Sequence, residues 1–301
     1  MRHTTVAGLV LLGLLTLVAT LGPSIAPYGV DEREPMRYTV DESGKRVPDL
    51  PPYPPSARHL FGTDPAGYDL LTRLLHGARY TLGFVIGVAA VRLTIALGIA
   101  SALHLRAHAR RRWQPEQPPH VSLGTAVPEF VVAYIAMVGI AFNPPTEPFA
   151  FALLQAALLT IIGLPGLVPT LRTRIERAAS QRFVESQVSS GADEWHIYRQ
   201  TVIPSIAHDL RLLLSHEALM VALIVGELAL FDVFVGGTYQ TFSPVENYSR
   251  THEWVGMVGQ NSDEILGGDL RLVLIPLAAY LVMIVSLALV SGAGRRGVDA
   301  R

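Results

Sequence analysis

Long hydrophobic runs separated by polar segments are the dominant pattern of this sequence. Six of these runs are predicted to be membrane-spanning helices, because each approaches or exceeds the roughly 20 apolar residues that cross a bilayer. They cover residues 6–24, 80–104, 121–142, 149–169, 211–236 and 271–291. The first run follows a short basic start and resembles a signal peptide. We expect it to be retained as a helix, because it is long and has no clear small-x-small cleavage site; a cleaved signal is the alternative.

Basic residues in the short polar segments predict the orientation. Arginines crowd the segment between the second and third runs and the segment between the fourth and fifth, whereas residues 143–148 contain no Lys or Arg. Because positive residues are retained on the cytoplasmic side, both termini and segment 183–204 are predicted to be cytoplasmic. The fold class is therefore an all-α integral membrane protein with one membrane domain. Its expected parts are a first transmembrane helix at 1–24, an extracytoplasmic loop at 25–79, a core of five helices at 80–292, and a cytoplasmic tail at 293–301.

Composition agrees with this class and excludes several functions. Of the 301 residues, 50% are hydrophobic and only 16% are charged, against about 25% charged in soluble domains. The net charge of −1 gives no general attraction to nucleic acid. Cysteine is absent, which excludes disulfides, thiol nucleophiles and cysteine metal sites. The scattered histidines show no metal-ligand spacing, and the sequence has no GxxxxGK[ST] phosphate-binding loop.

The polar segment FVESQVSSGADEWHIYRQTVIP, residues 183–204, lies between two hydrophobic runs. Apolar spacing predicts an amphipathic helix over 172–190, and Gly191 is placed to end it in a left-handed conformation. Asp193 can cap a second short helix that runs through Tyr198, and Pro204 marks the start of the next element. The predicted product is a helix–turn–helix projection that suits a groove on a partner protein.

Ionisable residues inside membrane spans are costly and face a partner or a cavity. Arg92 is expected either to pair with Glu129 inside the bundle or to line a pore, and Glu129 and Glu227 are further pore candidates. Two other classes of function stay open at this point. One is an intramembrane enzyme with a polar centre of Glu129, His216, Glu217 and Glu227; the other is a membrane scaffold whose cytoplasmic loop binds a partner.

Segment 183–204 resembles the loop through which permease subunits of binding-protein-dependent ABC importers contact their ATPases. The family pattern is approximately EAA, three residues, G, and then a helix ending in LP. The matching residues are Glu185, Gly191, Ile197, Ile203 and Pro204, with Asp193 and Trp195 also in keeping. The sequence departs from the pattern at Ser186 and Gln187, which replace the two alanines, and at Thr201, which replaces the usual histidine.

A second segment resembles the oligopeptide, dipeptide and nickel branch of the same family. Residues 54–82 carry an HxFGTDxxGxD signature ahead of the second span. The matching residues are His59, Gly62, Thr63, Asp64, Gly67, Asp69, Arg73, Gly77, Arg79 and Leu82, whereas Tyr68 stands where the family usually has arginine. Glu227, Leu230, Trp254 and the C-terminal tail also fit. The pattern is similar to the second of the two permease types in such importers.

The resemblance implies a type I ABC importer permease fold in a bacterial or archaeal cell membrane, and a transport component rather than an enzyme. It implies a second permease subunit, two ATPase subunits that carry ATP and Mg, an external solute-binding protein, and a peptide or similar solute, with no cofactor on this chain. It also implies that one set of residues docks the ATPase: Glu185, Ser186, Gly191, Ala192, Asp193, Trp195, Ile203 and Pro204.

Overall fold

The computed structural model describes residues 3–40, 45–109 and 127–292. These residues are mostly helical, and five of the helical segments are long and apolar enough to cross a membrane. The long helices are α1 (His3–Ile25), α2 (Leu70–Ala109), α5 (Pro148–Ala179), α8 (Ile203–Ala229) and α11 (Arg271–Gly292). The shorter ones are α4 (Glu129–Ala141), α6 (Arg182–Ser189), α7 (Glu194–Ile197), the π-helix η1 (Tyr198–Val202), α9 (Trp254–Gln260) and α10 (Glu264–Gly267).

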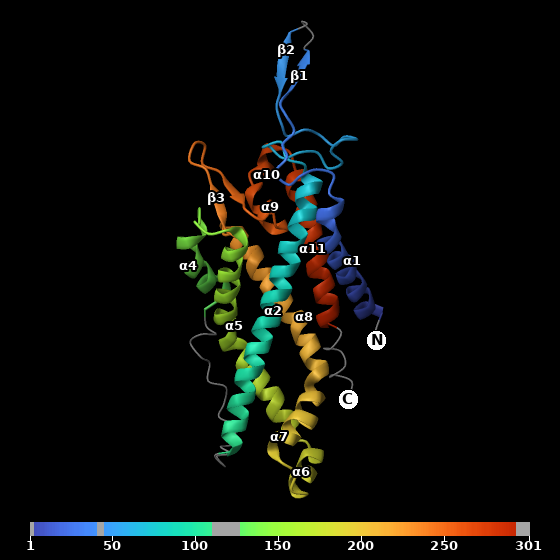
Figure 1. The fold of residues 1–301 in the computed structure, drawn as a ribbon, viewed down its shortest axis with the longest axis vertical. Coiled ribbons are helices and arrows are strands. Elements are labelled where there is room, and N and C mark those ends of the chain that lie inside the picture. The colour runs from blue at the N-terminus through green and yellow to red at the C-terminus, as the bar shows by residue number, and fades with distance from the viewer. Residues whose placement is uncertain (1–2, 41–44, 110–126, 293–301) are drawn as a thin grey trace.

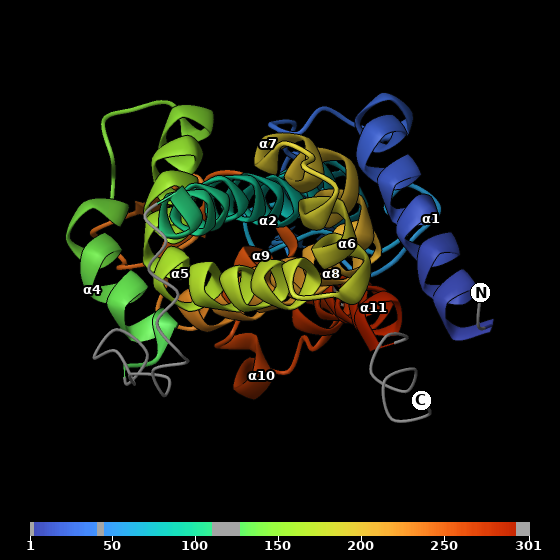
Figure 2. The same ribbon diagram turned by 90° about the horizontal axis from the view of Figure 1, so that it is seen from below.

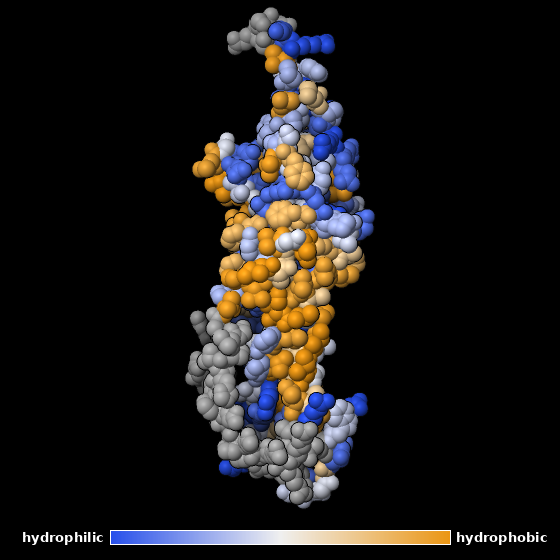
Figure 3. All heavy atoms as spheres, turned by 90° about the vertical axis from the view of Figure 1, so that its left-hand side faces the viewer, coloured by the Kyte–Doolittle hydropathy of each residue, from blue (hydrophilic) through white to orange (hydrophobic). Residues whose placement is uncertain are grey.

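The long helices form an elongated bundle. Helix α2 packs against α5, α8 and α1, and α11 packs against α1 and α8. Seen along the long axis, α1 and α4 lie on opposite sides of this bundle (Figure 2). A band of hydrophobic residues lies between two more hydrophilic ends on the face shown in Figure 3, as expected for a membrane protein.

The two ends of the bundle differ. Helices α6 and α7 lie at one end, and the N-terminal end of α1 faces the same way (Figure 1). The outer loops, with α9 and α10, lie at the other end. The start of α1 and segment 183–204 therefore face the same way along the bundle, and the assignment of this side to the cytoplasm stays a prediction. The predicted tail at 293–301 and the basic residues 110–112 lie outside the described residues.

The described chain is not all-α, which corrects the predicted class. Strands β1 (Arg37–Val40) and β2 (Arg46–Asp49) form an antiparallel pair, and β3 (Thr238–Gln240) pairs with β4 (Asn247–Ser249). Both pairs lie in the predicted outer loops. They are only three or four residues long, too short for the sequence to show a clear alternation.

Several predicted boundaries also change. Helix α2 begins at Leu70 and not at residue 80, because Leu70 is buried and the side chain of Asp69 caps the helix. Helix α4 has 13 residues and starts only after Pro128, whose backbone is extended, so it is shorter than the predicted third span; residues 121–126 of that span are not described. The predicted helix over 172–190 is broken between Ala179 and Arg182.

Candidate functional site

Residues 182–204, which are predicted to face the cytoplasm and are called the cytoplasmic projection below, have the predicted helix–turn–helix form. Helix α6 is followed by Gly191 at φ +79°, the left-handed conformation that ends a helix. The N–H of Ala192 donates to the carbonyl of Gln187 at 3.2 Å, which closes the last turn of α6. A Cβ atom at residue 191 would meet nothing within 4 Å. The backbone conformation, and not a lack of space, therefore calls for glycine here.

Asp193 caps the second helix of the projection, as predicted. Its Oδ2 accepts hydrogen bonds from the N–H groups of Trp195 at 3.1 Å and His196 at 3.2 Å. Helix α7 then continues through η1 into α8, with Pro204 in the first turn of α8. These contacts fix the angle at which the projection leaves the bundle.

The projection is held on the bundle by an apolar cluster and exposes two aromatic side chains. Ile197 and Tyr198 are buried in a cluster that includes residues of α2 and α5, and the Tyr198 hydroxyl hydrogen-bonds to that of Ser101 in α2. In contrast, Phe183 is 47% exposed and Trp195 is 56% exposed. The projection thus has a fixed apolar base and an exposed aromatic surface.

The other residues predicted for this site lie on the same projection. Glu185 belongs to α6, and its side chain lies outside what the structure describes. Ser186 is exposed and its hydroxyl donates to the carbonyl of Phe183 at 2.8 Å. Ala192 is exposed beside the turn, and Ile203 is partly buried at the start of α8.

Arg92 lies at the centre of a second polar cluster, inside the bundle. Its side chain is 1% exposed, and its Nη2 lies 2.5 Å from Oε1 of Glu129 in α4, the pairing that the sequence suggested. Its Nη1 lies 3.5 Å from Oε2 of Glu217 in α8, and Nη2 also donates to the carbonyl of Leu159 in α5. One guanidinium group thereby joins four helices. Sequence reasoning missed Glu217 as a partner, since it is far away along the chain.

The four residues of the alternative enzyme centre do not all lie together. Glu129 and Glu217 both face Arg92. Glu227 is exposed on α8, about 15 Å further along the helix than Glu217, at 1.5 Å per residue. Within the described ranges, no group of three or more His, Asp or Glu side chains is placed to hold a metal ion.

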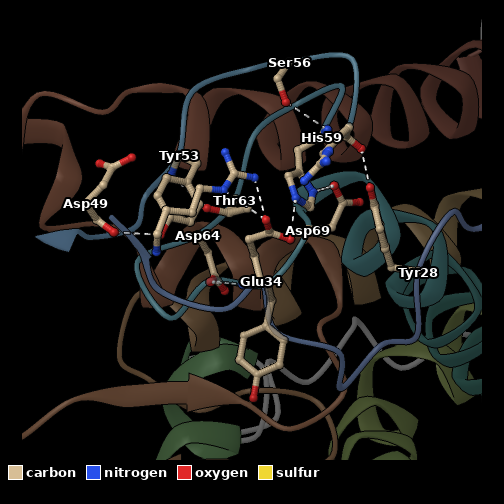
Figure 4. A network of polar contacts seen from close by, with 12 residues as sticks. Tyr28, Glu34, Asp49, Tyr53, Ser56, His59, Thr63, Asp64 and Asp69 are labelled. Carbon is tan, nitrogen blue, oxygen red and sulfur yellow. Dashed lines mark hydrogen bonds and ion pairs between the residues drawn. The ribbon is translucent and has the colours of Figure 1, made fainter. Parts of the chain in front are cut away.

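The outer signature forms a chain of polar contacts between α2 and the β1–β2 hairpin (Figure 4). Asp69 accepts the N–H of Thr72 at 2.7 Å through Oδ2, which caps α2, and its Oδ1 lies 2.9 Å from Nδ1 of His59. The other ring nitrogen of His59 lies 3.4 Å from Glu34. Glu34 in turn pairs with Arg37 of β1 at 2.6 Å, and this guanidinium lowers the pKa of the Glu34 carboxyl.

The small residues of the signature allow close backbone approaches. Gly62 has φ +79°, and a Cβ atom there would lie 2.5 Å from the carbonyl oxygen of Tyr53. Thr63 accepts the N–H of Tyr53 at 2.8 Å. A Cβ atom at Gly77 would lie 1.9 Å from the carbonyl oxygen of His252, so Gly77 lets α2 contact the last outer loop. These residues have architectural roles.

Tyr68, which departs from the family pattern, lies between two guanidinium groups. The Cζ atom of Arg33 lies 4.7 Å from the ring centroid and that of Arg73 lies 3.6 Å from it. Arg73 also forms an ion pair with Asp64 of the signature. The aromatic ring therefore joins the outer loop to α2 through cation–π contacts.

The match to a family model decides the identity of the chain. Residues 94–301 match the binding-protein-dependent transport system inner membrane component, and residues 2–52 match the N-terminal TM domain of oligopeptide transport permease C. The chain belongs to this transport family. It is therefore a multi-pass permease of the inner membrane and not a catalyst.

Individual relatives that match most of the chain are also transport permeases. The peptide transport system permease protein SapC of Escherichia coli O6:H1 is 26% identical over 292 residues, covering 95% of this chain and 86% of that protein. The dipeptide transport system permease protein DppC of Bacillus subtilis is 26% identical over 199 residues, covering 66% of this chain and 55% of that protein. The di/tripeptide transport system permease protein DppC of Pseudomonas aeruginosa is 29% identical over 204 residues, covering 66% and 59%. The match to each of the two DppC proteins thus spans less than two thirds of its length.

Proposed function

We propose that this chain is one of two permease subunits in an ATP-driven importer of peptides or related small solutes. The observation that carries the proposal is the cytoplasmic projection, a capped helix–turn–helix with Phe183 and Trp195 exposed on it. Exposed aromatic side chains on a rigid projection are typical of binding hot spots. The partner is an ATPase subunit, which carries the ATP and Mg that this chain has no phosphate-binding loop to hold.

The peptide substrate is inferred from the relatives. The three relatives described above are named as peptide, dipeptide or di/tripeptide transport permeases. The match of residues 2–52 to the oligopeptide permease N-terminal domain supports the second-permease type. An external solute-binding protein would deliver the peptide to the outer end of the bundle.

The proposed fold has six spans, with both termini in the cytoplasm and a type I importer arrangement. Helix α4 would belong to the third span. A surface hollow of about 870 Å³ between α2 and α5 is lined mainly by apolar residues and suits contact with the second permease. We retain Arg92, Glu129 and Glu227 as pore candidates; Arg92 would act through Glu129, since it is itself buried.

Substitutions at Gly191 test the proposed docking. The full importer would be purified in detergent from its native membrane through a tag on this chain, and the partners identified by mass spectrometry. We expect wild type to recover an ABC ATPase and a second permease. Gly191→Val should keep the second permease and lose most of the ATPase, because a β-branched residue is strained at positive φ. Glu185→Arg provides a second variant that changes charge and leaves the turn intact.

Gly191→Asn is the matched control, because asparagine adopts the left-handed conformation at lower cost than other side chains. Gly191→Asn should retain the ATPase. Uptake of a labelled peptide should likewise be retained with Gly191→Asn and lost with Gly191→Val. Normal ATPase recovery and uptake with Gly191→Val would refute the coupling role. Recovery of the wild-type chain alone, or with unrelated proteins, would refute the importer assignment.

A further inference from the structure

The β1–β2 hairpin stands away from the rest of the molecule. It projects from the outer end of the bundle, beyond α9 and α10 (Figure 1). On the face shown in Figure 3, a hydrophilic zone separates it from the hydrophobic band. The hairpin therefore extends into the space outside the membrane, on the side opposite to the cytoplasmic projection.

One face of the hairpin is mostly apolar, and its side chains are exposed in the part of the chain that the structure describes. The register pairs Tyr38 with Pro48 and Val40 with Arg46, and side chains of directly paired residues share a face. Tyr38 and Val40 are both 65% exposed. Met36 and Leu50 flank the strands and are also exposed. An isolated two-stranded hairpin is marginally stable in water, so an uncovered apolar face of this kind is suited to a partner.

The base of the hairpin is fixed to α2. The Tyr53 hydroxyl accepts the N–H of Arg37 at 3.2 Å and donates to the carbonyl of Asp49 at 2.8 Å, which ties the start of β1 to the end of β2. The guanidinium of Arg37 also lies 4.5 Å from the Tyr53 ring centroid. Through Glu34 and His59 the same base reaches Asp69, the cap of α2. A partner bound to the hairpin would thus be held in a defined position over α2.

We infer that the Tyr38 face of this hairpin is a docking surface for the extracytoplasmic solute-binding protein. The inference rests on the proposed function and names the surface that one of its partners uses. The family is binding-protein-dependent by description, so a protein outside the membrane has to meet the outer end of the permease. Lipid and the spans of a second permease would lie beside the hydrophobic band, below the hairpin on the face shown in Figure 3. Tyrosine next to aliphatic residues and arginine is the composition found at protein interfaces.

Site-specific photocrosslinking in cells tests the inference. A benzophenone amino acid would replace Tyr38 in the full importer, and the crosslinked product would be identified by mass spectrometry. The same amino acid at Phe242, an exposed residue in the β3–β4 turn, is the matched control. We expect a solute-binding protein to be crosslinked at 38 and far less at 242. A crosslink to the second permease or lipid alone would overturn the inference.

Recovery of the ATPase in the same samples separates this inference from the proposed function. If the ATPase is recovered and no binding protein is crosslinked at 38, the hairpin surface is wrong and the importer assignment stands. If no ATPase is recovered with the unsubstituted chain, the proposed function fails and this inference fails with it.

A pair of surface variants gives a functional readout. The solute-binding protein identified by the crosslink would be titrated against the reconstituted importer. Tyr38→Asp combined with Val40→Asp should raise the concentration of this protein that gives half-maximal ATPase stimulation about tenfold or more, as expected for interface hot spots. ATPase activity without binding protein should be unchanged. Thr39→Asp, on the opposite face of β1, should have little effect. Equal effects of the two changes, or none from either, would overturn the inference.

Discussion

The hydroxyl of Thr201 donates a hydrogen bond of 3.0 Å to the side-chain oxygen of Gln187. Both residues depart from the family pattern, in which the corresponding positions hold histidine and alanine. The bond joins α6 to η1 across the turn at Gly191. Two departures that look independent in the sequence therefore form a single contact in the structure.

Removing this contact should destabilise the projection in a non-additive way. Gln187→Ala and Thr201→Val should each lose about 1 kcal/mol, and the double variant should lose little more than either one, because the pair shares one hydrogen bond. Thermal unfolding in detergent, together with ATPase recovery, provides the double-mutant cycle. Ser186→Ala is the control, since the Ser186 hydroxyl bonds to the carbonyl of Phe183 on its own helix. Additive losses would contradict a direct coupling.

The Arg92 cluster predicts that removing the cation alone destabilises the protein more than removing the cation together with both carboxylate charges. Arg92→Ala leaves two carboxylates without their cation inside the bundle, at a cost of roughly 3–5 kcal/mol for a broken buried pair. Expression in the membrane and peptide uptake should both fall. Adding Glu129→Gln and Glu217→Gln should restore expression. Wild-type uptake and expression of Arg92→Ala would show that the cluster has no essential role.

Two glycines of α2 should respond to alanine in opposite ways. Gly77→Ala places a Cβ atom 1.9 Å from the carbonyl oxygen of His252 and should lower the melting temperature, because backbone has to move. At Gly98 a Cβ atom meets nothing within 4 Å. Gly98→Ala should therefore leave stability unchanged or raise it by up to about 1 kcal/mol, the difference in helix propensity. Differential scanning fluorimetry of both variants tests the close approach, which a tolerated Gly77→Ala would disprove.

Glu253 predicts a pH dependence of stability. Complete burial at the start of α9 raises the pKa of its carboxyl from 4.5 to about 7. The folded state then holds this proton at pH values where the unfolded state has released it. The stabilising contribution is full below about pH 4.5, declines as the pH rises, and is lost above about pH 7.

Melting curves between pH 4.5 and 8 measure this effect. The wild type should lose on the order of 3 kcal/mol from this group across the range, at 1.36 kcal/mol per pKa unit. Glu253→Gln should flatten that part of the profile and be the more stable protein at pH 8. Parallel profiles for the two proteins would rule out Glu253 as the source.

Local chemistry made part of the cytoplasmic projection predictable. The left-handed turn at Gly191, the cap at Asp193 and the start of α8 near Pro204 each depend on residues a few positions apart. Such features follow from backbone sterics and short-range hydrogen bonds. The break between α5 and α6 was missed, because the apolar spacing continues across it.

Contacts between distant segments were not predictable in the same way. Glu217 meets Arg92 across 125 positions, and the lack of a side chain at Gly163 in α5 leaves room for the guanidinium, since a Cβ atom there would lie 2.1 Å from its Cζ. The start of α2 at Leu70 was not predicted, for a related reason. Arg73 and Arg79 make the segment resemble a loop, and the burial of Arg73 depends on Asp64 and Tyr68 of the preceding loop.

Helix α2 has no proline between Leu70 and Ala109. Its 40 residues extend about 60 Å at 1.5 Å per residue. Its outer end is capped by the network beneath the hairpin, and near its inner end Ser101 meets Tyr198 of the cytoplasmic projection. An unbroken rod of this length acts as a lever: a tilt of about 5° at one end displaces the other by roughly 5 Å. A small rotation imposed by an ATPase at the inner end would thus move the outer end of α2 by more than the length of a hydrogen bond.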